Sequence, residues 1–234
     1  RIIEQKRHLL VEKPITLDLS EAKELNKLAK INNVSLMVGH LLLFHPAFIK
    51  IKNIVDEGKI GDIQYIYSNR LNLGSFRNDE NVLWSFAPHD ISLFNYFFES
   101  LPLTVFSNGV DILQKGVHDT SITSFKFDGN RMGHIFVSWL HPFKEHRFVL
   151  IGSKGMLHFE DARENKKLMF YKKSVDLNGG VPISKSDGEI EVSFSNELPL
   201  ESELKYFISN MDKKIKKANG DSAVDVMKVL ELAS

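Results

Sequence analysis

Cysteine is missing from this chain of 234 residues, and its absence excludes disulfides and thiolate metal sites. The longest apolar stretch, residues 41–51, is interrupted by His45, Pro46 and Lys50 and is too short to span a bilayer. An excess of one charge is also lacking, because 30 basic residues balance 30 acidic ones. The sequence therefore predicts neither a nucleic-acid-binding surface nor a membrane segment, and it fits a reducing, cytoplasmic compartment.

Two glycines separated by one residue do not occur, so the dinucleotide fingerprint G-x-G-x-x-G is absent from these residues. They lack the glycine-rich turn that places a pyrophosphate at a helix N-terminus. His-Glu-x-x-His and comparable clusters are missing too, so the nine histidines do not predict a metal site. The chain opens at Arg1 without Met, and we expect it to be a fragment whose natural N-terminus lies upstream.

A sizeable core can form, since 43% of the residues are apolar. The first 40 residues suggest the tail of a helix (1–6), a buried strand (9–11), a helix (17–31) and a second buried strand (34–40). This order is typical of a βαβ unit with a parallel sheet. Two strands do not make a doubly wound domain alone, so residues 1–40 are interpreted as its last part.

Residues 41–234 have a different pattern, and the whole chain is predicted to be a mixed α/β (α+β) fold. Helices are expected over 46–57, 87–99, 201–217 and 221–233, and strands over 62–73, 104–110, 121–127, 134–140, 147–151 and 156–160. Residues 174–188 carry three glycines and a proline and predict a loop. We expect one mainly antiparallel, open-faced sheet with helices on its other face. An apolar open face usually marks an interface.

Glu12, Lys13 and Pro14 follow the first strand directly. Proline ends a strand because it has no N–H to donate, so Glu12 and Lys13 lie at the carboxyl edge where α/β sheets bind ligands. A lysine there donates hydrogen bonds, and partial burial lets it exchange protons near neutral pH. The alternative is an ordinary solvated pair before a turn.

Residues 84–90 form a second constellation. Pro88 suits a first helical turn, which would place His89 and Asp90 near a helix N-terminus, where the helix dipole accounts for Asp90. His89 is a polar ring in an otherwise apolar helix, so it is either a hydrogen-bonded core residue or a chemical group.

Two polar groups are candidates for ligand contacts on strands. Arg70 and Asn72 share one strand face, which suits a hydroxylated or phosphorylated ligand and equally suits solvent. A further candidate segment is 139–144, which ends in Lys144.

The order of several motifs resembles the Gfo/Idh/MocA oxidoreductases. These motifs are Val11-Glu12-Lys13-Pro14, Gly39-His40, Phe44-His45-Pro46-Ala47, residues 59–63, Pro88-His89-Asp90 and residues 152–156. The resemblance covers nearly the whole chain. Residues 69–74 and 87–92 are most similar to the branch that acts on nucleotide-linked sugars in bacterial surface-polysaccharide pathways.

The resemblance implies two domains. Residues 1–40 would be the C-terminal remnant of a Rossmann domain that binds NAD or NADP, and residues 41–234 would bind the sugar and form a homo-oligomer through the open sheet face. The last helices of this second part would be able to pack back on the first. The implied site residues are Lys13 and His89 for catalysis, Glu12, Lys13, Pro14 and His40 for the cofactor, and Arg70, Asn72, Trp84 and Lys144 for the substrate.

The implied activity of the full-length protein is hydride transfer between NAD(P) and a carbinol of a sugar or nucleotide sugar. His89 would take the hydroxyl proton, and Lys13 would polarise the oxygen and contact the nicotinamide. The family's aspartate four residues before this histidine is Ser85 here, which affects how His89 is oriented or charged. The fragment alone is expected to be inactive. The alternatives are a non-catalytic binding or dimerisation module, and isomerase or hydrolase chemistry on the same fold.

Overall fold

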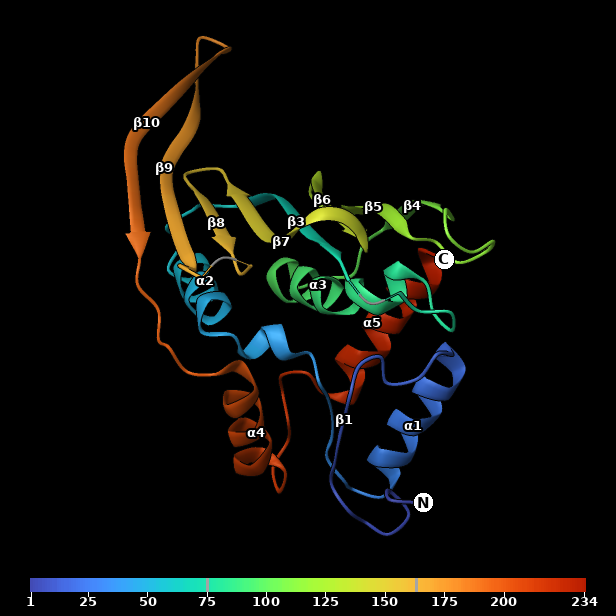
Figure 1. The fold of residues 1–234 in the computed structure, drawn as a ribbon. Coiled ribbons are helices and arrows are strands. Elements are labelled where there is room, and N and C mark those ends of the chain that lie inside the picture. Colours follow the sequence, from blue (N-terminus) through green and yellow to red (C-terminus); the bar gives the residue numbers. More distant parts are fainter. Residues whose placement is uncertain (75, 163) are drawn as a thin grey trace.

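The structure is a computed structural model that describes residues 1–74, 76–162 and 164–234. At one end a parallel strand pair, β1 (Leu9–Val11) and β2 (Leu36–Val38), is joined by helix α1 (Leu19–Ile31) (Figure 1). The side chain of Asp18 caps α1 by accepting the N–H of Glu21. This confirms the predicted βαβ unit. Residues 1–6 form turns instead of the expected helical tail, because so short a segment does not repay helix nucleation.

The larger part of the chain is built on one eight-stranded sheet. Its strands are β3 (Ile63–Leu73), β4 (Thr104–Val110), β5 (Thr120–Phe127), β6 (Arg131–Ser138), β7 (Leu140–Gly152), β8 (Met156–Glu160), β9 (Lys167–Asn178) and β10 (Val181–Val192). The strand order is β10-β9-β8-β7-β3-β6-β5-β4. Only the β3–β6 pair is parallel, so the predicted single, mainly antiparallel sheet is confirmed.

The loop predicted over residues 174–188 is wrong. These residues belong to the β9–β10 hairpin, which projects beyond the rest of the molecule (Figure 1). Gly179 and Gly180 have φ angles of +61° and +86° and form its two-residue turn. The glycines that predicted a loop therefore form the turn of a hairpin. Backbone hydrogen bonds between β9 and β10 stabilise this hairpin although most of its side chains are exposed.

Within the described residues, five helices accompany the sheets. Besides α1 they are α2 (Pro46–Asp56), α3 (Val82–Phe98), α4 (Pro199–Asn210) and α5 (Gly220–Leu232), with a short 3-10 turn, η1 (Leu41–Phe44). Helix α3 lies directly against one face of the large sheet (Figure 1). Apolar side chains remain exposed on the other face of β4, β5 and β6: Phe106, Val110, Ile122 and Met132. No helix of the described residues is long and apolar enough to cross a bilayer.

Aromatic packing fixes α3 on the sheet. The rings of Phe94 and Phe98 contact Phe125 and Phe127, with centroid distances of 5.6 and 4.0 Å. Gly133 allows this close approach, because a Cβ there would lie 2.7 Å from the Phe94 ring. The helix that carries His89 is therefore held rigidly against β5 and β6.

Several helix ends differ from the sequence prediction, most of all the start of α3 and the end of α4. Helix α3 begins at Val82 because Asn81 caps it, so Pro88 lies inside the helix and not in its first turn. Helix α4 ends at Asn210 and not at residue 217. Helix α5 begins at Gly220, one residue before the predicted start, and Asn219 caps it. The caps Asn81 and Asn219 therefore start α3 and α5 earlier than predicted.

Candidate functional site

Lys13 connects the two parts of the chain. It follows β1, and its Nζ donates a hydrogen bond of 2.6 Å to the carbonyl oxygen of Ser85 in α3. Burial lowers the pKa of the Lys13 ammonium, and the positive charges of Arg77 and Arg70 act in the same direction, against Glu80 and Glu12. Because Ser85 lies one helical turn before His89, this bond brings the Lys13 side chain to the face of α3 that carries His89.

His89 is largely buried, and its Nδ1 has no hydrogen-bond partner in the described part of the chain. Burial lowers its pKa well below the usual value, and the positive charges of Arg70 and Lys13 lower it further, as does the neighbouring His40. The imidazole is therefore neutral at pH 7. A neutral imidazole can accept a proton, which is the first requirement of a general base.

A second buried imidazole lies beside the first. The rings of His40 and His89 are 6.4 Å apart in an edge-to-face arrangement. His40 is only 2% exposed, and neither of its ring nitrogens finds a partner among the described residues. Burial, with the charge of Lys13, lowers its pKa to about 4. Buried polar atoms without partners are rare in proteins and are often found where a ligand supplies the bond.

Arg70 and Asp90 form a buried ion pair. Arg70 Nε donates to Asp90 Oδ2 at 2.7 Å and its Nη2 donates to Oδ1 at 3.1 Å, while Ser68 Oγ donates to the same carboxylate. Asp90 is 1% exposed and lies in the third turn of α3. The helix-dipole explanation of Asp90 is therefore wrong, because the residue pairs with Arg70 far from the helix start. The pair ties α3 to β3 next to His89.

The remaining predicted residues are distributed more widely. Glu12 is exposed, and its carboxylate lies against Gly39, where a Cβ would come within 3.3 Å of Oε2. Trp84 is half-buried, and its indole N–H donates to Ser234 Oγ at 2.8 Å. Asn72 is half-buried and Lys144 is exposed. The structure thus brings Lys13, His40, Arg70 and His89 together and leaves Trp84 and Lys144 outside this cluster. These substrate assignments remain predictions.

Two further titratable residues have strongly shifted pKa values. His146 on β7 pairs in register with Arg70, and burial, with the charges of Arg70 and Lys144, lowers its pKa to about 4. Glu203 on α4 is 2% exposed, and burial, with the charge of Glu12, raises its pKa to about 7. The register of β7 could have revealed His146, but no local pattern marks Glu203.

Comparison with protein families assigns both parts of the chain. Residues 1–40 match the oxidoreductase family with an NAD-binding Rossmann fold, and residues 48–158 match the GFO/IDH/MocA C-terminal domain. The chain belongs to the Gfo/Idh/MocA family. This confirms the resemblance found in the sequence, and the match over residues 1–40 identifies the βαβ unit as part of a Rossmann fold.

Individual relatives agree with this assignment. An uncharacterized oxidoreductase of Streptococcus pneumoniae is 24% identical over 170 residues, which are 66% of this chain and 46% of that protein. The scyllo-inositol 2-dehydrogenase (NAD(+)) of Bacillus subtilis is 26% identical over 165 residues, 66% of this chain and 48% of that protein. The chain spans about half the length of these curated relatives.

Solved structures share the fold. The UDP-N-acetylglucosamine 3-dehydrogenase of Acidithiobacillus ferrooxidans superimposes with a TM-score of 0.81 at 21% identity, over 97% of this chain and 70% of that one. An inositol dehydrogenase homolog from Azotobacter vinelandii, complexed with NAD+, gives 0.80 at 16% identity, over 99% and 70%. At these identities the likeness establishes the architecture of the Gfo/Idh/MocA proteins for this chain.

Proposed function

We propose that this chain supplies the substrate-binding part and the proton-transferring residues of an NAD(P)-dependent oxidoreductase. The reaction is hydride transfer between the nicotinamide and a carbinol carbon of a sugar, an inositol or a nucleotide sugar, with a role in bacterial surface-polysaccharide synthesis. The observation that carries the proposal is the approach of Lys13, from the nucleotide-binding part, to the helix face of His89. Relatives named as inositol and UDP-sugar dehydrogenases support the substrate class.

The residues present fit the nicotinamide end of a dinucleotide. Lys13 and His40 follow the carboxyl ends of β1 and β2, the edge at which α/β sheets bind ligands. The buried nitrogens of His40 and His89 that lack protein partners are available to a ligand. Glu12, Lys13, Pro14 and His40 would hold this end of the cofactor, which supplies the hydride acceptor or donor when bound.

His89 and Lys13 are proposed to act on the same substrate oxygen in different roles. Neutral His89 accepts the hydroxyl proton as the carbinol is oxidised and returns it in the reverse direction. The Lys13 ammonium donates a hydrogen bond to the same oxygen, and its lowered pKa eases proton exchange. Arg70 keeps His89 neutral through its charge, while its ion pair with Asp90 fixes the helix. Asn72, Trp84 and Lys144 are proposed contacts for the hydroxyl or phosphate groups of the substrate.

The two parts of the chain are proposed to have separate tasks. Residues 1–40 contribute to cofactor binding, and residues 41–234 bind the substrate and pair with a second copy through the open sheet face. Exposed apolar side chains on that face, among them Phe106 and Ile122, favour such a pairing.

A turnover assay on the full-length protein tests the proposal. Purified protein is mixed with NAD+ or NADP+ and a panel of inositols, free sugars and nucleotide sugars, and the absorbance of the reduced nicotinamide is followed. We expect substrate-dependent reduction with at least one member of the panel. Cofactor binding without any turnover across the panel would instead favour a non-catalytic binding module, in which Ser85 marks the loss of the family's aspartate.

A further inference from the structure

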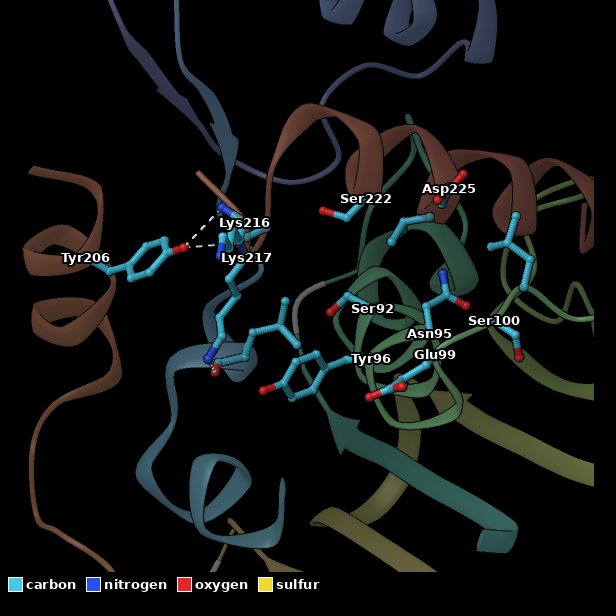
Figure 2. A pocket seen from close by; sticks show the side chains of 14 residues that line it. Ser92, Asn95, Tyr96, Glu99, Ser100, Tyr206, Lys216, Lys217, Ser222 and Asp225 are labelled. Atoms are coloured by element: carbon cyan, nitrogen blue, oxygen red, sulfur yellow. Dashed lines mark hydrogen bonds between the residues drawn. The ribbon is translucent and has the colours of Figure 1, made fainter. Parts of the chain in front are cut away.

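A cavity lies along α3 (Figure 2), and its lining includes Ser92 and Tyr96, three and seven residues after His89 in that helix. Its volume is about 650 Å³, and its walls come from η1, α3, α4, α5 and the connection over residues 211–219. Pockets for small molecules commonly measure roughly 300–1,000 Å³. The lining includes none of Lys13, His40, Arg70 and His89, so this cavity is separate from the proposed active site.

The cavity contains a lysine whose charge is unmatched. Lys217 is half-buried, and its Nζ lies 3.3 Å from the carbonyl oxygen of Leu43 and over the rings of Phe44 and Tyr96, at 5.3 and 5.4 Å from their centroids. No carboxylate of the described residues forms an ion pair with it. Burial lowers the pKa of this ammonium, and an anion placed beside it would offset that effect by favouring the charged form.

The acidic residues of the lining already have lysine partners. Glu99 pairs with Lys52 at 2.6 Å, a lysine that also pairs with Asp56 at 2.8 Å, and Asp225 pairs with Lys228 at 2.6 Å. Of the two lysines in the lining, Lys216 is exposed, and Lys217 is the half-buried cation that has no carboxylate partner in the described part of the chain. A ligand that complements this charge is an anion.

The other lining groups define the rest of the ligand. The amide nitrogen of Asn95 is buried without a partner among the described residues and enters the cavity from α3. The ring of Tyr96 and the apolar side chains of Leu43, Leu101 and Val226 form much of the wall. Tyr206 accepts the backbone N–H groups of residues 216 and 217 and so fixes the connection that carries the lysine.

We propose that this cavity binds a small organic anion with a flat apolar body. Lys217 pairs with the carboxylate, sulfonate or phosphate group, and the Asn95 amide donates to a second polar atom of the ligand. The cavity communicates with the active-site helix, because Ser92 in its lining donates through Oγ to the carbonyl oxygen of His89 at 2.7 Å.

Fluorescence titration with anilinonaphthalene sulfonate, a flat apolar anion, tests the site on the chain of residues 1–234. We expect saturable binding at one site, and Lys217→Met should weaken it by roughly tenfold to hundredfold, the factor that one charge-assisted hydrogen bond supplies. Lys217→Arg, which keeps the charge, should retain binding. Lys214→Met removes the same charge from an exposed position of the same connection outside the cavity, and should leave binding unchanged.

Two more measurements separate this cavity from other apolar surfaces. Asn95→Phe places a ring in the cavity and should abolish binding, provided circular dichroism shows an unchanged fold. The neutral analogue N-phenylnaphthylamine should bind more weakly than the sulfonate. The proposal is overturned if the dye does not saturate, if Lys217→Met and Lys214→Met behave alike, or if a folded Asn95→Phe variant still binds the dye at full strength.

Discussion

Arg70→Met should destabilise this protein far more than the loss of an ordinary surface charge. The substitution leaves Asp90, 1% exposed, without the two hydrogen bonds of 2.7 and 3.1 Å that the guanidinium donates. Removing one partner of a buried ion pair costs about 3–5 kcal/mol, because the remaining charge stays buried. A domain of this size has about 5–15 kcal/mol of stability, so the loss is a large fraction of the total.

Urea unfolding followed by circular dichroism measures this loss, with two matched variants. Arg77→Met removes an arginine that is 54% exposed and pairs with Glu80 at 3.1 Å, so we expect a change below about 1 kcal/mol. The double variant Arg70→Met with Asp90→Leu removes both charges and should be more stable than Arg70→Met alone. Equal losses for Arg70→Met and Arg77→Met would refute the buried-pair interpretation.

Four other predictions follow from the site. First, the free energy of unfolding should fall as the pH drops from 6.5 to 4, because His40 binds a proton in the unfolded chain but stays neutral in the folded protein, where its pKa is about 4. Urea unfolding of wild type and His40→Gln at several pH values tests this. The same dependence of unfolding free energy on pH in both proteins would contradict it. Second, kcat/KM of the full-length protein should be constant through neutral pH. It should fall on the acid side well below pH 6.5, where His89 is protonated, and on the alkaline side below pH 10.5, where Lys13 loses its proton. A fall on the acid side at or above pH 6.5 would show that burial does not set the pKa of His89. Third, Ser85→Asp should raise the pKa of His89, as measured by nuclear magnetic resonance, and should raise turnover if the serine has weakened catalysis, whereas Ser85→Asn should do neither. Equal pKa values of His89 in the two variants would show that a carboxylate at position 85 does not act on the imidazole. Fourth, calorimetric titration of residues 1–234 with NADH should show no tight binding, since these residues lack G-x-G-x-x-G; micromolar affinity would overturn that expectation.

Much of the fold can be predicted from the sequence, because hydrophobic patterns and helix-capping residues indicate the same elements. The strand predicted over 9–11 is confirmed, and the helix predicted over 17–31 and the strand predicted over 34–40 are confirmed with shorter bounds, Leu19–Ile31 and Leu36–Val38. The β9–β10 hairpin could not be predicted, because Gly179 and Gly180 in a polar segment indicate a loop. The backbone pairing that stabilises the hairpin depends on both strands together and is not a property of either strand alone.

The candidate site, too, can be predicted from the sequence only in part. Lys13 and His89 could be named from the order of motifs, because their positions after a strand and within a helix are local features. The pairing of Arg70 with Asp90 could not be predicted, since it depends on how α3 packs across β3. The same packing neutralises His89 by burial, which no sequence pattern near residue 89 encodes.

The most direct test of the central claim is the single-turnover rate of hydride transfer in the full-length protein, compared between wild type and His89→Gln. If His89 takes the substrate proton, the variant should transfer hydride roughly a hundredfold to ten-thousandfold more slowly while its affinity for the nicotinamide cofactor is unchanged. Lys13→Met should slow the same step. A His89→Gln protein that transfers hydride at the wild-type rate would contradict the assignment and leave His89 as a core residue of α3.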